Sequence, residues 1–178
     1  MRTSLVLTLI GDDRPGIVEK LADEVLAAGA NWEESRMARL AGKFAGVLRI
    51  SVDADRAAAL EERLTAFATD GLRVVVEPSA DNQPSAFRTL RLELVGNDHP
   101  GIVRDISRAL AHRQINIEEL ETDVTSAPMT GEALFRARAT LRTPSAVTLE
   151  ELRTTLEALA RELMVDLALD ESRAAAAR

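Results

Sequence analysis

The chain has 178 residues, a length that fits one large domain or two small ones. Apolar residues make up 46% and charged residues 29%, as in a globular protein, and the net charge of −7 disfavours direct binding to DNA. There are no cysteines, which excludes disulfides, thiolate catalysis and cysteine-bound zinc.

The first half of the chain predicts the element order βαββαβ. Leu5, Leu7 and Leu9 alternate with other residues in a strand, and Pro15 is expected in the first turn of the helix that follows and ends at Gly29. Strands are predicted over 32–40, 44–52 and 72–77, with a helix between the last two that Asp53 or Asp55 would cap. The expected apolar helix positions are Ile17, Val18, Leu21, Val25 and Leu26 in the first helix and Leu60, Leu64 and Phe67 in the second.

A polar segment with two prolines follows, and the same pattern then restarts. We predict a first domain over 1–78, a linker over 79–86, a second domain over 87–170 and a flexible tail over 171–178. Strands are expected around 90–94, 117–126, 132–141 and 164–169. The apolar helix positions are Ile102, Val103, Ile106 and Leu110, then Leu149, Leu152, Leu156, Leu159 and Leu163, a stripe that favours core over a coiled coil.

Two ferredoxin-like domains in tandem are therefore the expected fold. Each would be an α+β unit with a four-stranded antiparallel sheet and two helices on one face. Units of about 80 residues bury a modest fraction of their surface, so we also expect packing against a neighbouring copy or a second chain. A homodimer is the simplest form.

A short motif occurs twice, at a fixed spacing of 85 residues (96 − 11 and 101 − 16). Gly-Asp-Asp-Arg-Pro-Gly stands at 11–16 and Gly-Asn-Asp-His-Pro-Gly at 96–101, and Asn31 and Asn116 keep the same spacing. Repetition at one period marks a duplicated structural unit. Each copy has a turn that leads from a strand into a helix, where backbone N–H groups can hold an anion.

Catalytic chemistry finds little support in the sequence. The only histidines are His99 and His112, and the residue matching His99 in the first copy is Arg14. Acidic pairs such as Glu33 and Glu34 are adjacent, so in a strand they would point to opposite faces. No phosphate-binding glycine loop or metal-ligand spacing is present. We expect no enzymatic activity, no cofactor and no metal.

The duplicated turn remains as the candidate site. Its exposed N–H groups suit an α-carboxylate, and Asp13 or Asp98 suits an α-ammonium, a combination that matches an amino acid. The same aspartates could instead be ordinary helix caps. Asn31 and Asn116 could bind a ligand through their amides, or they could simply take a left-handed turn. If they bind a ligand, each asparagine is expected to meet the aspartate of a neighbouring copy or chain. The candidate ligand-binding residues are Gly11, Asp12, Asp13, Arg14, Pro15, Gly16, Ile17, Asn31, Gly96, Asn97, Asp98, His99, Pro100, Gly101, Ile102 and Asn116.

These segments resemble the ACT domain, a small regulatory module that binds amino acids. Two such ACT-like segments in tandem, over 2–78 and 87–169, resemble the glycine cleavage system transcriptional repressor family. The similarity is strongest in the segments 31–40 and 116–120. In serine-binding ACT domains the ligand contacts come from the positions of Asp13, Asn31, Asp98 and Asn116. This chain departs from that pattern in having aspartate rather than asparagine at 13 and 98, and in having Gly11 and Gly96 where such domains carry a histidine. The resemblance implies interfacial amino-acid binding and contact with a transcriptional activator.

The sequence thus favours a cytoplasmic, non-enzymatic amino-acid sensor, with glycine as the leading ligand and no contact with membranes or nucleic acid. No apolar stretch approaches the about 18 residues of a membrane span, and the N-terminus has no signal-peptide core. Two alternatives stay open. One is a protein-interaction module that binds its partner constitutively without a ligand, and the other is a detached regulatory subunit of an amino-acid metabolic enzyme.

Overall fold

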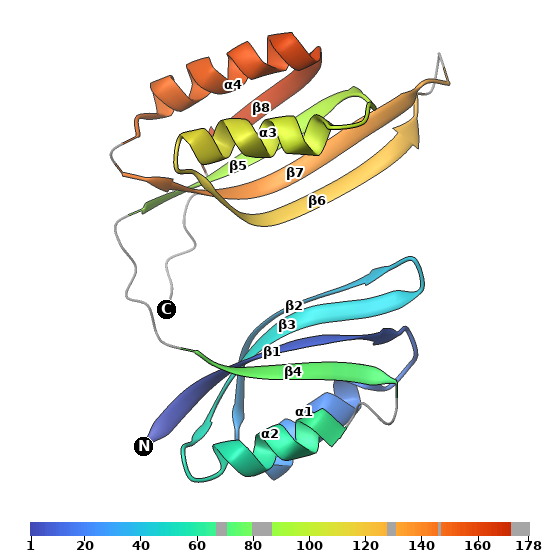
Figure 1. The fold of residues 1–178 in the computed structure, drawn as a ribbon, viewed down its shortest axis with the longest axis vertical. Helices are drawn as coiled ribbons and strands as arrows, with labels where there is room; N and C mark the ends of the chain where they lie inside the picture. Colours follow the sequence, from blue (N-terminus) through green and yellow to red (C-terminus); the bar gives the residue numbers. More distant parts are fainter. Residues whose placement is uncertain (67–70, 80–86, 128–130, 146, 172–178) are drawn as a thin grey trace. The chain divides into compact units, whose positions relative to one another are not determined.

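The computed structural model describes residues 1–66, 71–79, 87–127, 131–145 and 147–171. The chain forms two compact units, Met1–Gln83 and Pro84–Arg178. Each contains the elements βαββαβ in chain order (Figure 1). The ferredoxin-like α+β fold expected from the sequence is therefore confirmed in both halves.

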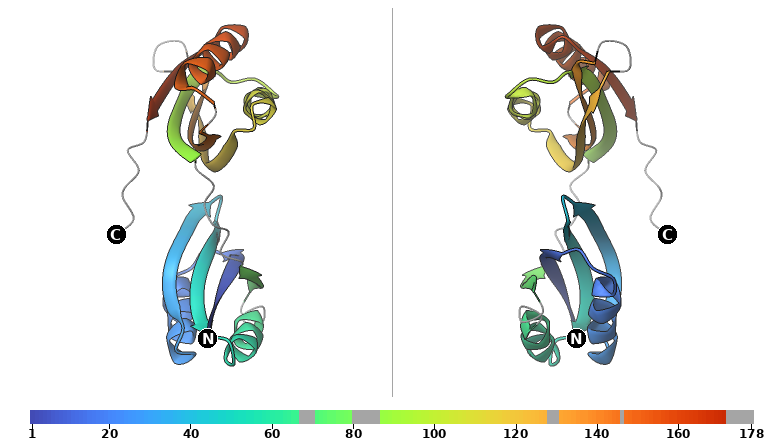
Figure 2. Two further views of the ribbon diagram at one scale, coloured as in Figure 1. Left: turned by 90° about the vertical axis from the view of Figure 1, so that its left-hand side faces the viewer. Right: turned by 90° about the vertical axis from the view of Figure 1, so that its right-hand side faces the viewer.

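The first unit is a four-stranded antiparallel sheet in the order β2-β3-β1-β4. Both helices cover the same face of this sheet (Figure 2). The elements are β1 (Arg2–Asp12), α1 (Ile17–Ala27), β2 (Asn31–Leu40), β3 (Lys43–Asp53), α2 (Ala57–Thr65) and β4 (Leu72–Ser79). Strand β4 thus runs into the start of the segment expected as a linker, and residues 80–86 of that segment lie outside the described part.

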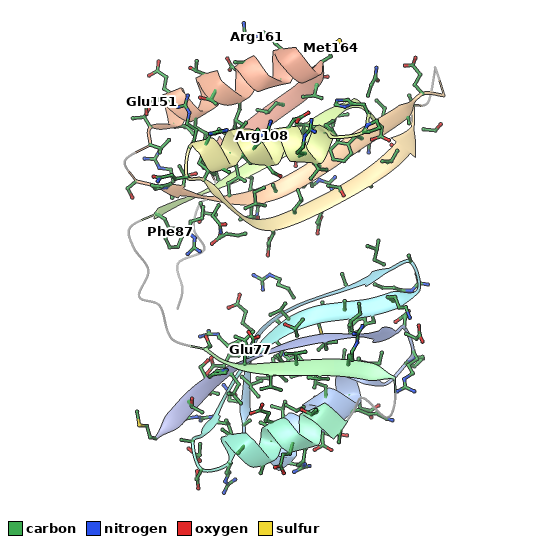
Figure 3. All side chains as sticks on the ribbon, viewed as in Figure 1. Glu77, Phe87, Arg108, Glu151, Arg161 and Met164 are labelled. Atoms are coloured by element: carbon green, nitrogen blue, oxygen red, sulfur yellow. The ribbon has the colours of Figure 1, made fainter. Side chains whose placement is uncertain are left out.

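The second unit repeats the arrangement, with the sheet order β6-β7-β5-β8. Its elements are β5 (Phe87–Asn97), α3 (Ile102–His112), β6 (Asn116–Ser126), β7 (Ala133–Pro144), α4 (Leu149–Leu163) and β8 (Val165–Glu171). At the start of β5, Phe87 lies against Arg142, whose guanidinium carbon is 4.9 Å from the ring centroid (Figure 3). The tail expected over 171–178 lies outside the described residues except for Glu171.

Leucines on alternate positions of the central strands build the two cores. Leu5, Leu7 and Leu9 of β1 are buried under α1 and α2, and the same alternation recurs in β5. In α1 the buried residues Ile17, Leu21 and Val25 follow a spacing of four. The equivalent buried residues of the second unit are Leu90, Leu92 and Leu94 in β5 and Ile102, Ile106 and Leu110 in α3.

Several local expectations were wrong at the borders of these elements. Val18, Leu26 and Val103 are 45%, 75% and 41% exposed, because a single row of side chains suffices to seal each helix against its sheet. Neither Asp53 nor Asp55 caps α2; its N-cap is Arg56, without a side-chain cap. Phe67 lies outside the described residues, and the side chains of Leu159 and Leu163 are likewise not described.

Candidate functional site

Each repeated turn is fixed to the rim of its own sheet. After β1 ends, the backbone N–H of Asp13 donates to the carbonyl of Gly42, at 2.9 Å. The N–H of Asp98 makes the same bond to Ala133, also at 2.9 Å. Both turns therefore sit beside the connection between the two strands that follow, in matching positions of the two units.

A left-handed glycine opens the helix in both turns. The N-cap residues are Gly16, with φ 89°, and Gly101, with φ 98°, and neither helix has a side-chain cap. Pro15 consequently precedes the helix, which begins at Ile17, and the expectation that it stands in the first turn was wrong. Because glycine has no Cβ, it adopts this conformation without strain and leaves the first backbone N–H groups of the helix without a capping side chain.

The reading of Asp13 and Asp98 as helix caps is therefore wrong, and their carboxylates have other surroundings. Asp13 is held by Arg39 of β2, whose Nε lies 2.7 Å from Oδ2. The residue that matches Arg39 at the spacing of 85 is Val124 (39 + 85), which is 55% exposed. Within the described residues, Asp98 has no side-chain hydrogen bond or ion pair. The second turn thus holds an exposed, uncompensated carboxylate, whereas the first is neutralised.

The charged neighbours of the turns also differ between the two copies. Asp12 pairs with Lys43, and this hydrogen bond and charge lower the pKa of Asp12. Its counterpart Asn97 carries no charge. His99 is half-buried, and its Nδ1 lies 3.4 Å from the carbonyl oxygen of Pro100. Two ion pairs, Asp13 with Arg39 and Asp12 with Lys43, therefore hold the first turn, and the second turn has no equivalent of either pair.

Gly11 and Gly96 have no room for a side chain. A Cβ on Gly11 would lie 2.8 Å from the carbonyl oxygen of Gly71, and one on Gly96 would lie 2.3 Å from Cγ1 of Val165. Both glycines are buried where the central strand passes its neighbour on the sheet edge. This close approach leaves no room for a histidine, or any other side chain, at either position.

The matched asparagines lie at the opposite end of the sheet from the turns. Asn31 opens β2 and pairs with Ser51, which in turn pairs with Ser4 of β1. Asp12, next to the turn, is eight residues further along β1 (12 − 4), about 27 Å away. Asn116 holds the equivalent place in β6. One small ligand cannot touch the turn and the asparagine of the same unit.

Neither asparagine takes the left-handed conformation. The positive φ angles before β2 and β6 belong to Gly29, at 66°, and Gln114, at 57°. That alternative reading was wrong, because the left-handed residue that follows each helix stands two residues before the asparagine (31 − 29 and 116 − 114). Both asparagine side chains are exposed and therefore accessible to a ligand or to another chain.

The acidic pair on β2 corrects a further expectation. A β-bulge after Trp32 breaks the alternation, and Glu33 and Glu34 both reach Arg49, at 3.5 Å and 4.0 Å. They therefore do not point to opposite faces. A bulge recurs after Ile117, where Glu118 pairs with Arg142 at 3.1 Å. These carboxylates are bound by arginine.

The described part of the chain contains no group of three or more residues that could hold a metal ion. None of its helices is long and apolar enough to cross a membrane.

Models of the ACT domain match residues 3–77 and 85–161. The chain therefore belongs to the ACT-domain family and carries two copies in tandem. It is 26% identical over 161 residues to the glycine cleavage system transcriptional repressor of Escherichia coli (strain K12), covering 89% of this chain and 85% of that protein. The chain is thus a tandem ACT protein distantly related to that repressor.

Two solved structures share this architecture over nearly the whole chain. A protein of unknown function from Galdieria sulphuraria is 31% identical, with a TM-score of 0.86, covering 97% of this chain and 99% of that one. A candidate glycine cleavage system transcriptional repressor is 23% identical, with a TM-score of 0.73, covering 96% and 97%. The second match supports the fold alone.

Proposed function

We propose that this chain is a non-enzymatic regulatory protein that binds a small amino acid at its repeated turns and thereby changes its affinity for a protein partner. The observation that carries the proposal is the second turn, where the unpaired carboxylate of Asp98 stands beside the uncapped start of α3. The carboxylate would receive the ligand's ammonium group, and the helix N–H groups would receive its carboxylate. Glycine is the leading ligand.

The separation between turn and asparagine supports a shared site. Because Asn31 and Asn116 lie about 27 Å from the turns of their own units, a ligand held by aspartate and asparagine together must take them from different domains. A second chain would supply the missing amide, and ligand binding would then favour one packing of the domains. Coupling of this kind is typically worth about 1–3 kcal/mol.

We propose a transcriptional activator as the partner, contacted by protein surfaces. The named relative is a transcriptional repressor, and the net charge of −7 disfavours a direct phosphate contact with DNA. No basic tract is present that would supply such a contact.

The test is a thermal-shift screen of the twenty amino acids, followed by calorimetry. We expect glycine to raise the melting temperature of the wild-type chain, and Asp13→Ala and Asp98→Ala each to weaken binding while leaving the fold intact. Asp98→Ala should have the larger effect, since Asp13 is already neutralised by Arg39. Asp55→Ala, at an exposed position before α2, is the matched control. Unchanged affinity for glycine in both turn variants would show that the repeated turns are not the binding site.

The ion pair between Asp13 and Arg39 favours one alternative for the first unit. A turn whose carboxylate is satisfied within the protein needs no ligand, as in a constitutive interaction module. Failure of every amino acid to shift the melting temperature, together with ligand-independent capture of the partner, would support this alternative.

A further inference from the structure

The helix that lies over each edge strand carries an exposed apolar side. In the first unit α1 contacts α2 through the ion pair between Glu24 and Arg63, and it also contacts the edge strand β2. At about 100° per residue, Val18 and Leu26 lie on the side of α1 that faces away from Glu24. They are 45% and 75% exposed, and Val103 on the matching side of α3 is 41% exposed. Both apolar sides therefore face the free edge of their own sheet.

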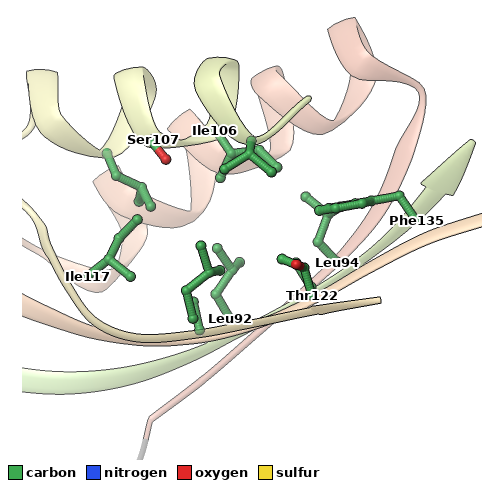
Figure 4. Close-up of a pocket in the computed structure, with 12 residues that line it drawn as sticks. Leu92, Leu94, Ile106, Ser107, Ile117, Thr122 and Phe135 are labelled. Carbon is green, nitrogen blue, oxygen red and sulfur yellow. The ribbon is translucent and has the colours of Figure 1, made fainter. Parts of the chain in front are cut away.

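In the second unit the apolar surface continues from α3 onto the edge strand β6 (Figure 4). Ser107 of α3 and Thr122 of β6 border it, together with Leu120, which is 45% exposed. The hollow between them has a volume of about 20 Å³, room for a single water molecule, so it is too small for an organic ligand. An exposed apolar surface without a ligand pocket is typical of a contact with another protein surface.

The charges beside these apolar sides are reversed between the two units. Glu19 and Asp23 of α1 stand where α3 has Arg104 and Arg108, at the spacing of 85 residues (104 − 19 and 108 − 23). All four side chains are exposed, and Figure 3 labels Arg108. Within the described residues neither Glu19 nor Asp23 has an ion pair, and Arg104 has an exposed one with Asp105 at 2.8 Å, which is worth little. Two α1 helices side by side would repel each other, as would two α3 helices, whereas α1 and α3 attract.

The edge strands also favour a contact between unlike units. On the sheet face without helices, β6 presents the exposed residues Glu119, Glu121 and Asp123 at alternate positions. Antiparallel pairing of two β6 strands would place these carboxylates opposite one another, which is destabilising. The matching positions in β2 are Glu34, Arg36 and Ala38 (119 − 85, 121 − 85 and 123 − 85). A β6 edge is therefore better matched by β2 than by a second β6.

We infer that the first unit of one copy pairs with the second unit of another copy through these surfaces. The β2 edge lies along the β6 edge, and α1 lies beside α3, so that Ala22 and Ser107, the middle residues of the two helices, face each other. The acidic side of α1 then meets the basic side of α3, next to a contact between the apolar sides. The partner is a second copy of this chain, because the complementary surface is present in the same sequence. In a two-fold dimer the contact occurs twice.

Charge exchange between the two helices tests the choice of partner. We expect Glu19→Arg/Asp23→Arg, which copies the residues of α3, to raise the dissociation constant of the dimer at least tenfold. Sedimentation velocity at low ionic strength measures it, because exposed charges are least screened there. Adding Arg104→Glu/Arg108→Asp to the same chain exchanges the two helix faces and should return the dissociation constant to within threefold of wild type. Pairing of like units predicts no loss in the first variant, since its helices would repel as they do in the wild type.

The matched control is Glu61→Arg/Glu62→Arg, which makes the same change of net charge at exposed positions of α2. It should leave the dissociation constant within twofold of wild type, and circular dichroism checks the fold of every variant. A folded Glu19→Arg/Asp23→Arg chain that dimerises as wild type does overturns the inference. So does a folded four-site exchange that fails to restore the dimer, or a wild-type chain that is monomeric at every concentration.

Disulfide trapping identifies the facing helices directly, since the chain contains no cysteine of its own. A mixture of the Ala22→Cys and Ser107→Cys chains should form at least tenfold more mixed dimer than either homodimer under mild oxidation. In the control mixture, Ala58→Cys on α2 replaces Ala22→Cys and should give background only. Homodimers of the Ala22→Cys chain as the main product, or no mixed dimer above the control, would overturn the inference. Neither experiment contains an amino acid, so both results are independent of the ligand binding proposed above.

Discussion

At the level of single residues, Thr143 of β7 is a buried hydroxyl without a partner. It is 1% exposed, and its Oγ1 has no hydrogen bond within the described residues. The matching residue of the first unit is Val52, which is fully buried (143 − 91). Burying an unsatisfied hydroxyl costs free energy that valine, of the same shape, does not incur.

We therefore expect Thr143→Val to raise the free energy of unfolding by about 1 kcal/mol, measured by urea denaturation. Thr140→Val on the same strand is the control, because the Thr140 hydroxyl donates to Glu119 at 3.1 Å and its loss should not stabilise the protein. A Thr143→Val protein that unfolds at lower urea than wild type would contradict this account.

Gly96 is a second residue whose role is steric. A Cβ there would meet Val165 of β8 at 2.3 Å, so Gly96→Ala should cost about 1–3 kcal/mol of stability through overpacking. Denaturation measures the loss. Combining it with Val165→Ala should restore part of the stability, because alanine lacks Cγ1, the nearest contacting atom, although its Cβ would still lie at 2.9 Å. Two independent, additive losses would argue against this steric account.

Among the elements, α4 has the best-defined start. Thr148 and Glu151 form a capping box, in which the Thr148 hydroxyl accepts from the Glu151 N–H at 3.2 Å and Glu151 accepts from the Thr148 N–H at 3.0 Å. The backbone hydrogen bond from Thr148, and then the bond from its hydroxyl, lower the pKa of Glu151 below the ordinary 4.5. A lowered pKa in the folded state stabilises the protein above pH 4.5.

This contribution should disappear as the pH falls from 4.5 through the lowered pKa of Glu151. We expect Glu151→Gln to show a weaker dependence of the melting temperature on pH in that range than wild type, because glutamine does not titrate. Glu150→Gln, at a neighbouring exposed position outside the capping box, should keep the wild-type dependence. Parallel curves for wild type and Glu151→Gln would contradict the assignment.

Sequence periodicity predicted the helices and strands themselves. Their ends were less predictable, because caps and bulges depend on one or two residues. A glycine with positive φ, and not Asp13 or Pro15, opens α1, and the bulge after Trp32 lets both Glu33 and Glu34 reach Arg49. Neither feature has a periodic signal in the sequence.

For the whole molecule, we expect a homodimer in solution. Strands β2 and β6 stand at the edges of their sheets, each with one row of backbone groups unpaired by a neighbouring strand in the described structure. Leu40, Leu120 and Val124 on these strands are 80%, 45% and 55% exposed. Exposed edges of this kind are ready to pair with another chain.

Light scattering after size exclusion should give a mass near twice the 19.3 kDa of one chain. Dilution should shift the mass toward one chain if association is reversible. A mass of 19.3 kDa at every concentration would contradict the dimer, and with it the idea that a second chain supplies the asparagine.

The sequence alone determined the βαββαβ fold of each half, because alternating and helical apolar patterns are local signals. It also determined the position of the repeated turns, because a fixed spacing of 85 residues is a periodic signal. Only the tertiary structure decided that Asp13 is neutralised by Arg39 while Asp98 is unpaired, and that Gly11 and Gly96 leave no room for a side chain. These properties depend on which strands become neighbours. Residues far apart in the chain meet there, and their spacing in the sequence does not show the contact.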